Sequence, residues 1–194
     1  TIWISGASTG IGLATAKKFL NNNWKVIISS SNYEKLLLAK KQLLLKSENK
    51  ELYAYKCDIS DRIQVTETVN KITKQIGNIN LAILNAAAYT PNKEQVFSIQ
   101  NFEKLIDVNL KGTIFCIESL INNMKNNQNH IAIMASPVGY RGLPTGAAYG
   151  LTKAGLINLA ESLFFDLKKE KIKISLINPG FIESELTKLN SFPM

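Results

Sequence analysis

The chain has 194 residues, of which 45% are hydrophobic, and a formal net charge of +8. With a mean hydropathy of −0.01, it is expected to form one soluble globular domain, 1–194, with a substantial core. It lacks both a secretory signal and an apolar stretch long enough to cross a bilayer, and its two cysteines and single histidine argue against a disulfide scaffold or a metal site. We therefore expect a cytoplasmic protein with reduced thiols, no membrane association and no bound metal.

Short apolar segments alternate with longer segments of helical periodicity along the chain. Strands are predicted at 1–5, 24–30, 51–56, 80–85, 130–135 and 172–178. Helices are predicted at 11–22, 33–47, 60–76, 99–125 and 147–169. This alternation predicts an α/β fold, a Rossmann-like doubly wound parallel sheet with helices on both faces and strand order 3-2-1-4-5-6. Ligands of such a sheet bind at the carboxyl ends of its strands, near the switch between strands 1 and 4.

A glycine-rich turn follows the first strand. Gly6, Gly10 and Gly12 stand between an apolar run and a helical pattern, which is the context of a dinucleotide-binding loop. Glycines let the backbone approach a pyrophosphate closely, and the helix N-terminus offers free N–H groups to the phosphates. The spacing is Gly-x-x-x-Gly-x-Gly, not the Gly-x-Gly-x-x-Gly of long-chain dehydrogenases. The alternative is a turn that merely joins strand to helix.

The end of the second strand bears on cofactor choice. An acidic residue there would bind the ribose hydroxyls of NAD and repel a 2′-phosphate. This strand ends in Ser30 and Ser31 without a carboxylate, and Lys35 follows. We therefore predict NADP as the preferred cofactor, with NAD as the second choice. The alternative is that these serines simply end a strand.

Tyr149 and Lys153 stand four residues apart in a predicted helix, so both side chains lie on one face. A nearby cation favours the phenolate and lowers the pKa of a tyrosine. The pair is suited to proton transfer in carbonyl/alcohol chemistry. The alternative is an exposed helix face.

Further motifs follow one another from Ile2 to about Leu186. They are 5–12, Cys57-Asp58-Ile59, Asn85-Ala86-Ala87, 108–112 with Asn109, Ser136 thirteen positions before Tyr149, and Asn178-Pro179-Gly180. In order and spacing they resemble those of the short-chain dehydrogenase/reductase family, in its classical type. The resemblance implies an enzyme that interconverts a carbonyl and an alcohol by NAD(P)-dependent hydride transfer.

The resemblance also implies roles for four catalytic residues. Tyr149 would donate a proton to the carbonyl oxygen, and Lys153 would lower its pKa and bind the nicotinamide ribose. Ser136 would hold the substrate oxygen, or, alternatively, only bond local backbone at a strand end. Asn109 would hold a water that links Lys153 to solvent, or, alternatively, mark a helix kink. The cofactor contacts that the resemblance implies are Gly6, Ser8, Thr9, Gly10, Ile11, Gly12, Ser30, Ser31, Asp58, Ile59, Asn85, Ala86, Ala87, Tyr149, Lys153, Pro179, Gly180, Ile182 and Ser184.

The chain departs from the family's pattern in two places. Ala87 stands where the family usually has glycine, which argues against a close backbone approach there. The chain ends at Met194, where a typical member continues through a substrate loop, another helix and a seventh strand, so the C-terminal part of the usual fold is expected to be missing. Apolar residues on more than one face of helices 99–125 and 147–169 suggest a partner helix or, alternatively, ordinary core packing. The resemblance implies a homodimer or homotetramer through these two helices.

Several alternatives stay open for the function. One is a redox-inactive regulatory protein that binds dinucleotide. Another is a nucleic-acid-binding protein, which only the net charge supports; the lysines are dispersed, so we expect no nucleic-acid partner. Among enzymes, 3-oxoacyl-carrier-protein reduction competes with hydroxysteroid and general aldehyde/ketone chemistry. The basic field would favour an anionic cofactor or an acyl-carrier substrate.

Overall fold

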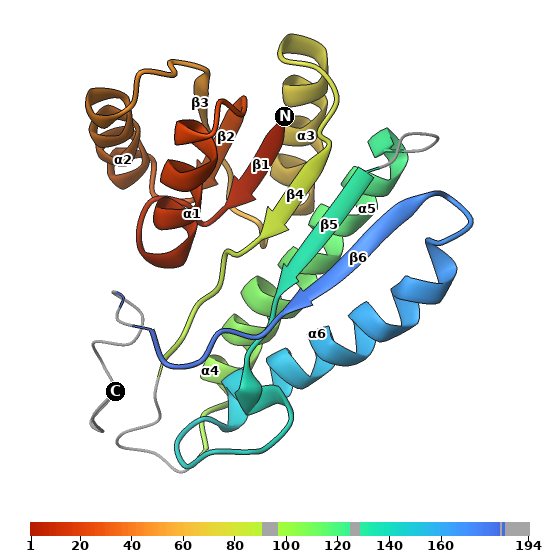
Figure 1. Cartoon of the computed structure of the whole chain (residues 1–194). Helices are drawn as coiled ribbons and strands as arrows, with labels where there is room; N and C mark the ends of the chain where they lie inside the picture. The colour runs from red at the N-terminus through yellow and green to blue at the C-terminus, as the bar shows by residue number, and fades with distance from the viewer. Residues whose placement is uncertain (91–96, 125–128, 183, 185–194) are drawn as a thin grey trace.

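The computed structural model describes residues 1–90, 97–124, 129–182 and 184. Within these residues, six strands form a parallel sheet in the order β3-β2-β1-β4-β5-β6 (Figure 1). The strands are β1 (Ile2–Ser5), β2 (Val26–Ser30), β3 (Leu52–Lys56), β4 (Leu81–Leu84), β5 (Asn129–Met134) and β6 (Ile172–Ile177). The predicted fold class and strand order are confirmed.

The helices connect the strands in the predicted alternation. They are α1 (Gly10–Asn21), α2 (Tyr33–Lys46), α3 (Arg62–Gln75), α4 (Ile99–Leu105), α5 (Gly112–Met124) and α6 (Ala147–Asp166), with a π-helix η1 (Ile106–Lys111) and a 3₁₀-helix η2 (Pro137–Gly139). The single helix predicted at 99–125 is therefore wrong in one respect, since η1 interrupts it; residue 125 lies outside the described residues. Such π segments occur frequently at functional sites.

Local turn chemistry explains the shifted boundaries. β2 begins two residues later than predicted because Asn23 has a φ of 61° and Trp24 packs edge-on against Phe19, with ring centroids 5.1 Å apart. α3 begins at Arg62 because Asp61 caps it, accepting hydrogen bonds from the Ile63 and Gln64 amides. These hydrogen bonds hold the pKa of the Asp61 carboxyl below its usual value.

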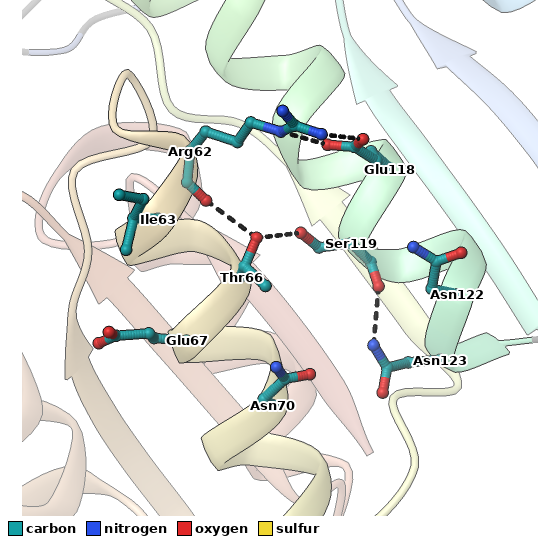
Figure 2. Close-up of a pocket in the computed structure, with 9 residues that line it drawn as sticks. All are labelled: Arg62, Ile63, Thr66, Glu67, Asn70, Glu118, Ser119, Asn122 and Asn123. Atoms are coloured by element: carbon teal, nitrogen blue, oxygen red, sulfur yellow. Dashed lines mark hydrogen bonds and ion pairs between the residues drawn. The ribbon is translucent and has the colours of Figure 1, made fainter.

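Polar contacts join the outer surfaces of α3 and α5 (Figure 2). Arg62 donates to both carboxylate oxygens of Glu118, at 2.9 and 2.6 Å, and Thr66 lies 3.3 Å from the Ser119 hydroxyl. These four side chains line a hollow of about 510 Å³. Arg62 and Glu118 pair with each other and are both exposed to solvent. We therefore interpret this hollow as a result of helix packing and not as a reaction site.

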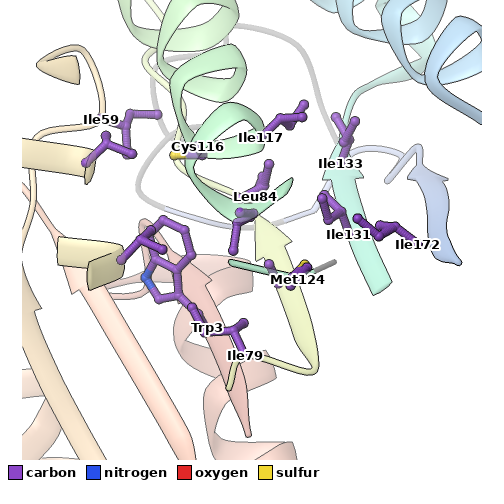
Figure 3. Close-up of a cluster of buried hydrophobic side chains, with 14 of the residues drawn as sticks. Trp3, Ile59, Ile79, Leu84, Cys116, Ile117, Met124, Ile131, Ile133 and Ile172 are labelled. Carbon is purple, nitrogen blue, oxygen red and sulfur yellow. The ribbon is translucent and has the colours of Figure 1, made fainter. Parts of the chain in front are cut away.

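Two apolar cores lie on opposite faces of the sheet. Trp3 belongs to the core under α3, α5 and α6, whereas its neighbours Ile2 and Ile4 belong to the core under α1 and α2. In Figure 3, Trp3, Leu84 and Ile131 project from three strands toward α5. Successive strand residues point to opposite faces of the sheet, and helices cover both faces, so both faces are apolar. Polar side chains of the site are therefore found at the carboxyl ends of the strands.

Candidate functional site

A cavity of about 390 Å³ opens at the carboxyl ends of β1 to β4. Its lining residues are Gly6, Ser8, Thr9, Gly10, Ile11, Ser30, Ser31, Cys57, Asp58, Ile59, Asn85, Ala86, Ala87, Ala88, Lys104, Val108 and Ser184. Most of the predicted cofactor contacts are therefore brought together in one place. Gly12, Tyr149, Lys153, Pro179, Gly180 and Ile182 are not among the lining residues.

Four of the lining residues were missed from the sequence. Cys57 and Val108 belong to quoted motifs but were not named as cofactor contacts, and Ala88 stands next to a motif, so proximity in the chain was a usable signal. Lys104 belongs to no motif. It lines the cavity because it lies four residues before Val108, and residues at this spacing share a helix face.

The glycine turn is shaped by close backbone contacts. Gly6 has a φ of 64°, and a Cβ built there would lie 2.5 Å from the Ala86 Cα. A Cβ on Gly12 would lie 2.6 Å from the Gly6 carbonyl oxygen. In this turn, the backbone of Gly6 comes closest to that of Ala86. Ala87, which stands where the family usually has glycine, lines the cavity.

Hydrogen bonds hold this turn to the loop after β4. The Ser5 hydroxyl accepts from the amides of Asn85 and Ala86, both at 3.1 Å. The Asn85 side chain donates to the carbonyls of Ser5 and Gly6 at 3.1 and 3.0 Å. Asn85 therefore fixes the two backbones that form the floor of the cavity.

The start of α1 fits an anionic group. Thr9 precedes the helix in an extended conformation without a capping side-chain bond, and no acidic residue stands in the first turn. Gly10 and Ile11 from this turn line the cavity. Free N–H groups and the positive end of the helix dipole thus face the cavity, which suits a pyrophosphate.

The hydroxyls at the end of β2 lie in the same cavity. Ser30 Oγ is 3.2 Å from Ser8 Oγ and accepts from the Asn32 amide at 3.3 Å. Ser31 is exposed. On the neighbouring segment after β3, Asp58 accepts from the Ser60 amide and hydroxyl. No carboxylate of β2 or of the two residues after it faces Ser30, since this segment reads Val26 to Asn32 without an acid.

Tyr149 and Lys153 occupy successive turns at the start of α6. The Lys153 Nζ lies 5.4 Å from the centroid of the Tyr149 ring and donates to the Met134 carbonyl at 2.7 Å. The Lys153 side chain is buried, with 2% of the residue exposed. Burial lowers the pKa of Lys153 to about 8, so the ammonium is still the main form at neutral pH.

The predicted lowering of the Tyr149 pKa is wrong for this structure. Burial, and after it Tyr89, raises the pKa of Tyr149 to about 12. The physical reason is that burial removes the phenolate from water, and the free energy of this desolvation is larger than the stabilisation by one ammonium. That ammonium, on Lys153, lies over the ring and is itself buried. At neutral pH Tyr149 therefore keeps its proton, as a proton donor must.

Asn109 lies within the π-helix η1 and is fully buried. Its Oδ1 accepts from the Ala88 amide at 2.7 Å, and its Nδ2 donates to the Ala88 carbonyl at 3.0 Å and to Thr152 Oγ1 at 3.2 Å. Thr152 Oγ1 in turn donates to the Tyr149 carbonyl at 2.7 Å. Asn109 thus lies at the helix interruption that the kink alternative expected, and it ties the loop after β4 to the first turn of α6. That Asn109 holds a water stays a prediction.

Ser136 follows β5 and begins η2, where its hydroxyl accepts from the Val138 amide at 3.4 Å. This is the local backbone contact that was weighed as the alternative. On the neighbouring segment after β6, Asn178 donates to the Tyr140 hydroxyl at 3.3 Å. That bond links the segment before α6 to the one that carries Pro179 and Gly180.

The model of the short chain dehydrogenase family matches residues 1–192. The chain belongs to this family. It is 34% identical over 193 residues to the 3-oxoacyl-[acyl-carrier-protein] reductase of Rickettsia typhi, covering 98% of this chain and 76% of that protein. A short-chain dehydrogenase is an oxidoreductase, so the chain is an enzyme of that class.

Solved structures agree with the assignment to the short-chain dehydrogenases. The NADP-bound structure of ElxO is 30% identical, covers 96% of this chain and 76% of its own, and superposes with a TM-score of 0.86. An NAD⁺-bound xylitol dehydrogenase is 27% identical, covers 94% and 70%, and has a TM-score of 0.85. Relatives of this short-chain dehydrogenase therefore bind either dinucleotide.

Proposed function

We propose that the chain transfers hydride between a nicotinamide dinucleotide and a small carbonyl/alcohol pair, with Tyr149 as the general acid in reduction. The observation that carries this proposal is the buried Lys153 ammonium 5.4 Å from the ring of a protonated Tyr149. The helix turn of this pair is linked through Thr152 and Asn109 to Ala88, which lines the cavity at the sheet edge. The glycine turn and the uncapped α1 fit a dinucleotide there. When bound, the dinucleotide supplies the hydride that adds to the carbonyl carbon.

The chain's own residues would handle the proton. As the oxygen of the substrate gains negative charge, Tyr149 gives it the phenolic proton and becomes a phenolate. Lys153 stabilises this phenolate by its charge. Ser136 would hold the substrate oxygen, and Asn109 would keep the helix turn of Tyr149 in register through Thr152. In alcohol oxidation the same proton returns to Tyr149.

A panel of carbonyl substrates with each reduced cofactor tests the proposal. A 3-oxoacyl chain on an acyl-carrier protein comes first, because the Rickettsia relative is a reductase of that class and the net charge of +8 suits an acidic carrier. Hydroxysteroid and simple aldehyde or ketone substrates follow. Dinucleotide binding without turnover of any substrate would favour the redox-inactive regulatory protein instead.

We expect NADPH to bind at least as tightly as NADH. Ser30 and Ser31 line the cavity at the end of β2, where a carboxylate would otherwise select NAD. A hydrogen bond to a charged group is worth about 1.5–3 kcal/mol, so the preference should be modest. Ser30→Asp should weaken NADPH binding and spare NADH, as measured by fluorescence titration. Wild-type binding of NADH more than about tenfold tighter than NADPH would contradict this expectation.

We further propose that the chain forms a homodimer or homotetramer through α5 and α6. Among the apolar residues of α5, Ile117 and Leu120 are buried and belong to the core, so they cannot contact a partner chain. The surplus apolar surface is carried by Phe165, 71% exposed, together with Phe164, Leu151 and Ile114. Light scattering at micromolar concentration should show an oligomer, which Phe165→Lys weakens. Leu45→Lys on α2, also strongly exposed, is the matched control, and a monomeric wild-type chain would refute the proposal.

The remaining expectations stay predictions: one domain over 1–194, a cytoplasmic location, and no nucleic-acid partner. Of the helices that the structure describes, none is long and apolar enough to span a bilayer. Among the same residues, no three His, Cys, Asp or Glu side chains are grouped as metal ligands would be. Cys57 and Cys116 are both free, in keeping with a reducing compartment.

A further inference from the structure

We propose that Tyr89, in the loop after β4, is a positioning residue for Tyr149, whose ring it fixes and shields from water. The proposal rests on the proposed role of Tyr149 as the general acid. The two rings meet edge to face, with centroids 5.1 Å apart and planes at 70°. This geometry is preferred for aromatic pairs and restricts how either ring can turn.

The backbone on both sides of this ring pair is held by one buried hydrogen-bond network. Asn109 binds both the amide and the carbonyl of Ala88, the residue next to Tyr89. The same Asn109 side chain donates to Thr152, which donates to the Tyr149 carbonyl. The loop of Tyr89 and the helix turn of Tyr149 are thus fixed to each other through a side chain with no exposed surface. Tyr89 is therefore a fixed wall of the Tyr149 environment.

Within the described ranges 1–90, 97–124, 129–182 and 184, the titratable groups that contact the Tyr149 ring are Lys153 on the next turn of α6 and Tyr89 itself. Burial raises the pKa of Tyr89, so its phenol is neutral near pH 7. The larger cause of the raised pKa of Tyr149 is burial, to which the Tyr89 ring contributes, and the smaller is the charge interaction with Tyr89. The charged groups of neighbouring elements face elsewhere. Asp107 and Lys111 of η1 pair with each other at 2.8 Å, and Lys173 of β6 acts on His130.

Three other titratable side chains near α6 in the described part of the chain are exposed. Glu103 and Lys104 of α4 are exposed, as is Tyr140 after η2, which bonds Asn178. Removing the Tyr89 ring should therefore mainly increase the access of water to the Tyr149 phenol. Water stabilises a phenolate, so the pKa of Tyr149 should fall when the ring of Tyr89 is removed.

The test compares Tyr89→Ala, which removes the ring, with Tyr89→Phe, which keeps it. Alcohol oxidation needs Tyr149 as a base, so its rate rises with pH through the pKa of Tyr149. Tyr89→Ala should move this rise to lower pH and lower kcat about ten- to a hundredfold through misorientation of the phenol, with little change in the KM of the cofactor. Tyr89→Phe keeps the ring, and with it the burial that is the larger cause of the raised pKa of Tyr149, so its kcat and pH profile should stay much closer to those of the wild type than those of Tyr89→Ala.

A readout without turnover separates this proposal from the proposed function. In protein labelled with ¹³C at the tyrosine ring carbons, Tyr149→Phe identifies the Tyr149 resonance, whose titration is then followed over the pH range in which circular dichroism stays native. In Tyr89→Ala, the resonance of Tyr149 should titrate at a lower pH than in the wild type. If this shift appears in a protein that turns over no substrate, the proposed function fails and the positioning role stands.

Two controls guard against a merely structural effect. Tyr53→Ala removes another half-buried tyrosine, far from α6 in the chain, and should lower stability without moving the Tyr149 titration. Tyr89→Leu replaces Tyr89→Ala if the latter fails to fold, and should shift the titration in the same direction. An unchanged titration and pH profile in the ring-deleted variant, or Tyr89→Phe behaving like Tyr89→Ala, would overturn the proposal.

Discussion

Tyr149→Phe is expected to abolish turnover while leaving cofactor binding nearly intact. The variant keeps the aromatic ring that packs against Tyr89 and lies under Lys153, and it removes only the transferable proton. General acid catalysis contributes about 10²–10⁴-fold to the rate, so kcat should fall by that factor. Steady-state kinetics and a dinucleotide titration on the same preparation measure both quantities. If more than about a tenth of the wild-type kcat survived, the loss would be too small for a general acid.

Lys153→Met provides the informative comparison. It removes the charge that stabilises the phenolate and also the donor to the Met134 carbonyl, which is left buried without that partner. We expect this variant to lose activity and, unlike Tyr149→Phe, to bind the cofactor more weakly. Equal cofactor binding in both variants would show that Lys153 acts on Tyr149 alone and does not reach the dinucleotide.

Gly12→Ala is expected to weaken dinucleotide binding by more than about tenfold, a loss of about 1.4 kcal/mol. The added Cβ would lie 2.6 Å from the Gly6 carbonyl oxygen and 2.7 Å from Asn85 Nδ2, so the whole turn must move. Overpacking of this kind costs about 1–3 kcal/mol of stability. Fluorescence titration of the reduced dinucleotide and urea unfolding measure the two effects.

Gly142→Ala is the matched control for this substitution. A Cβ at Gly142 would meet no heavy atom within 4 Å, and its φ does not lie in the left-handed region. The control should therefore fold and bind dinucleotide like the wild type. If Gly12→Ala bound the dinucleotide as tightly as the wild type, α1 could shift away from Gly6 without disturbing the cavity. The close approach of Gly12 to Gly6 would then not be required for cofactor binding.

The sequence predicted the sheet well because each strand and helix carries a local periodic signal. β1 is a run of apolar residues followed by glycines, and α1 begins where the glycines end, so both follow from residues close together in the chain. Strand order then followed from the right-handed crossovers that parallel strands require. The clustering of cavity residues followed too, because carboxyl ends of parallel strands meet at one edge of the sheet.

Features that depend on contacts distant in the chain were missed or predicted wrongly. The interruption of 99–125 by η1 was expected only as the alternative of a kink at Asn109, because the helical pattern runs on through it. The Asn109 side chain meets its partners Ala88 and Thr152 only after folding. The meeting of Tyr89 with Tyr149 likewise joins residues sixty positions apart. No motif spacing encodes such pairs, since the loop after β4 is placed by the packing around it.

The chain's order of residues thus determined the fold, the glycine turn and the one-turn spacing of Tyr149 and Lys153, because these depend on backbone geometry and local periodicity. Only the tertiary structure decided the protonation of that pair. The sequence placed a cation near a phenol and indicated a lowered pKa, but folding buries both groups, lowers the pKa of Lys153 to about 8 and raises that of Tyr149 to about 12. Burial is a property of the surrounding packing, and for both groups desolvation is the largest cause of the shift in pKa.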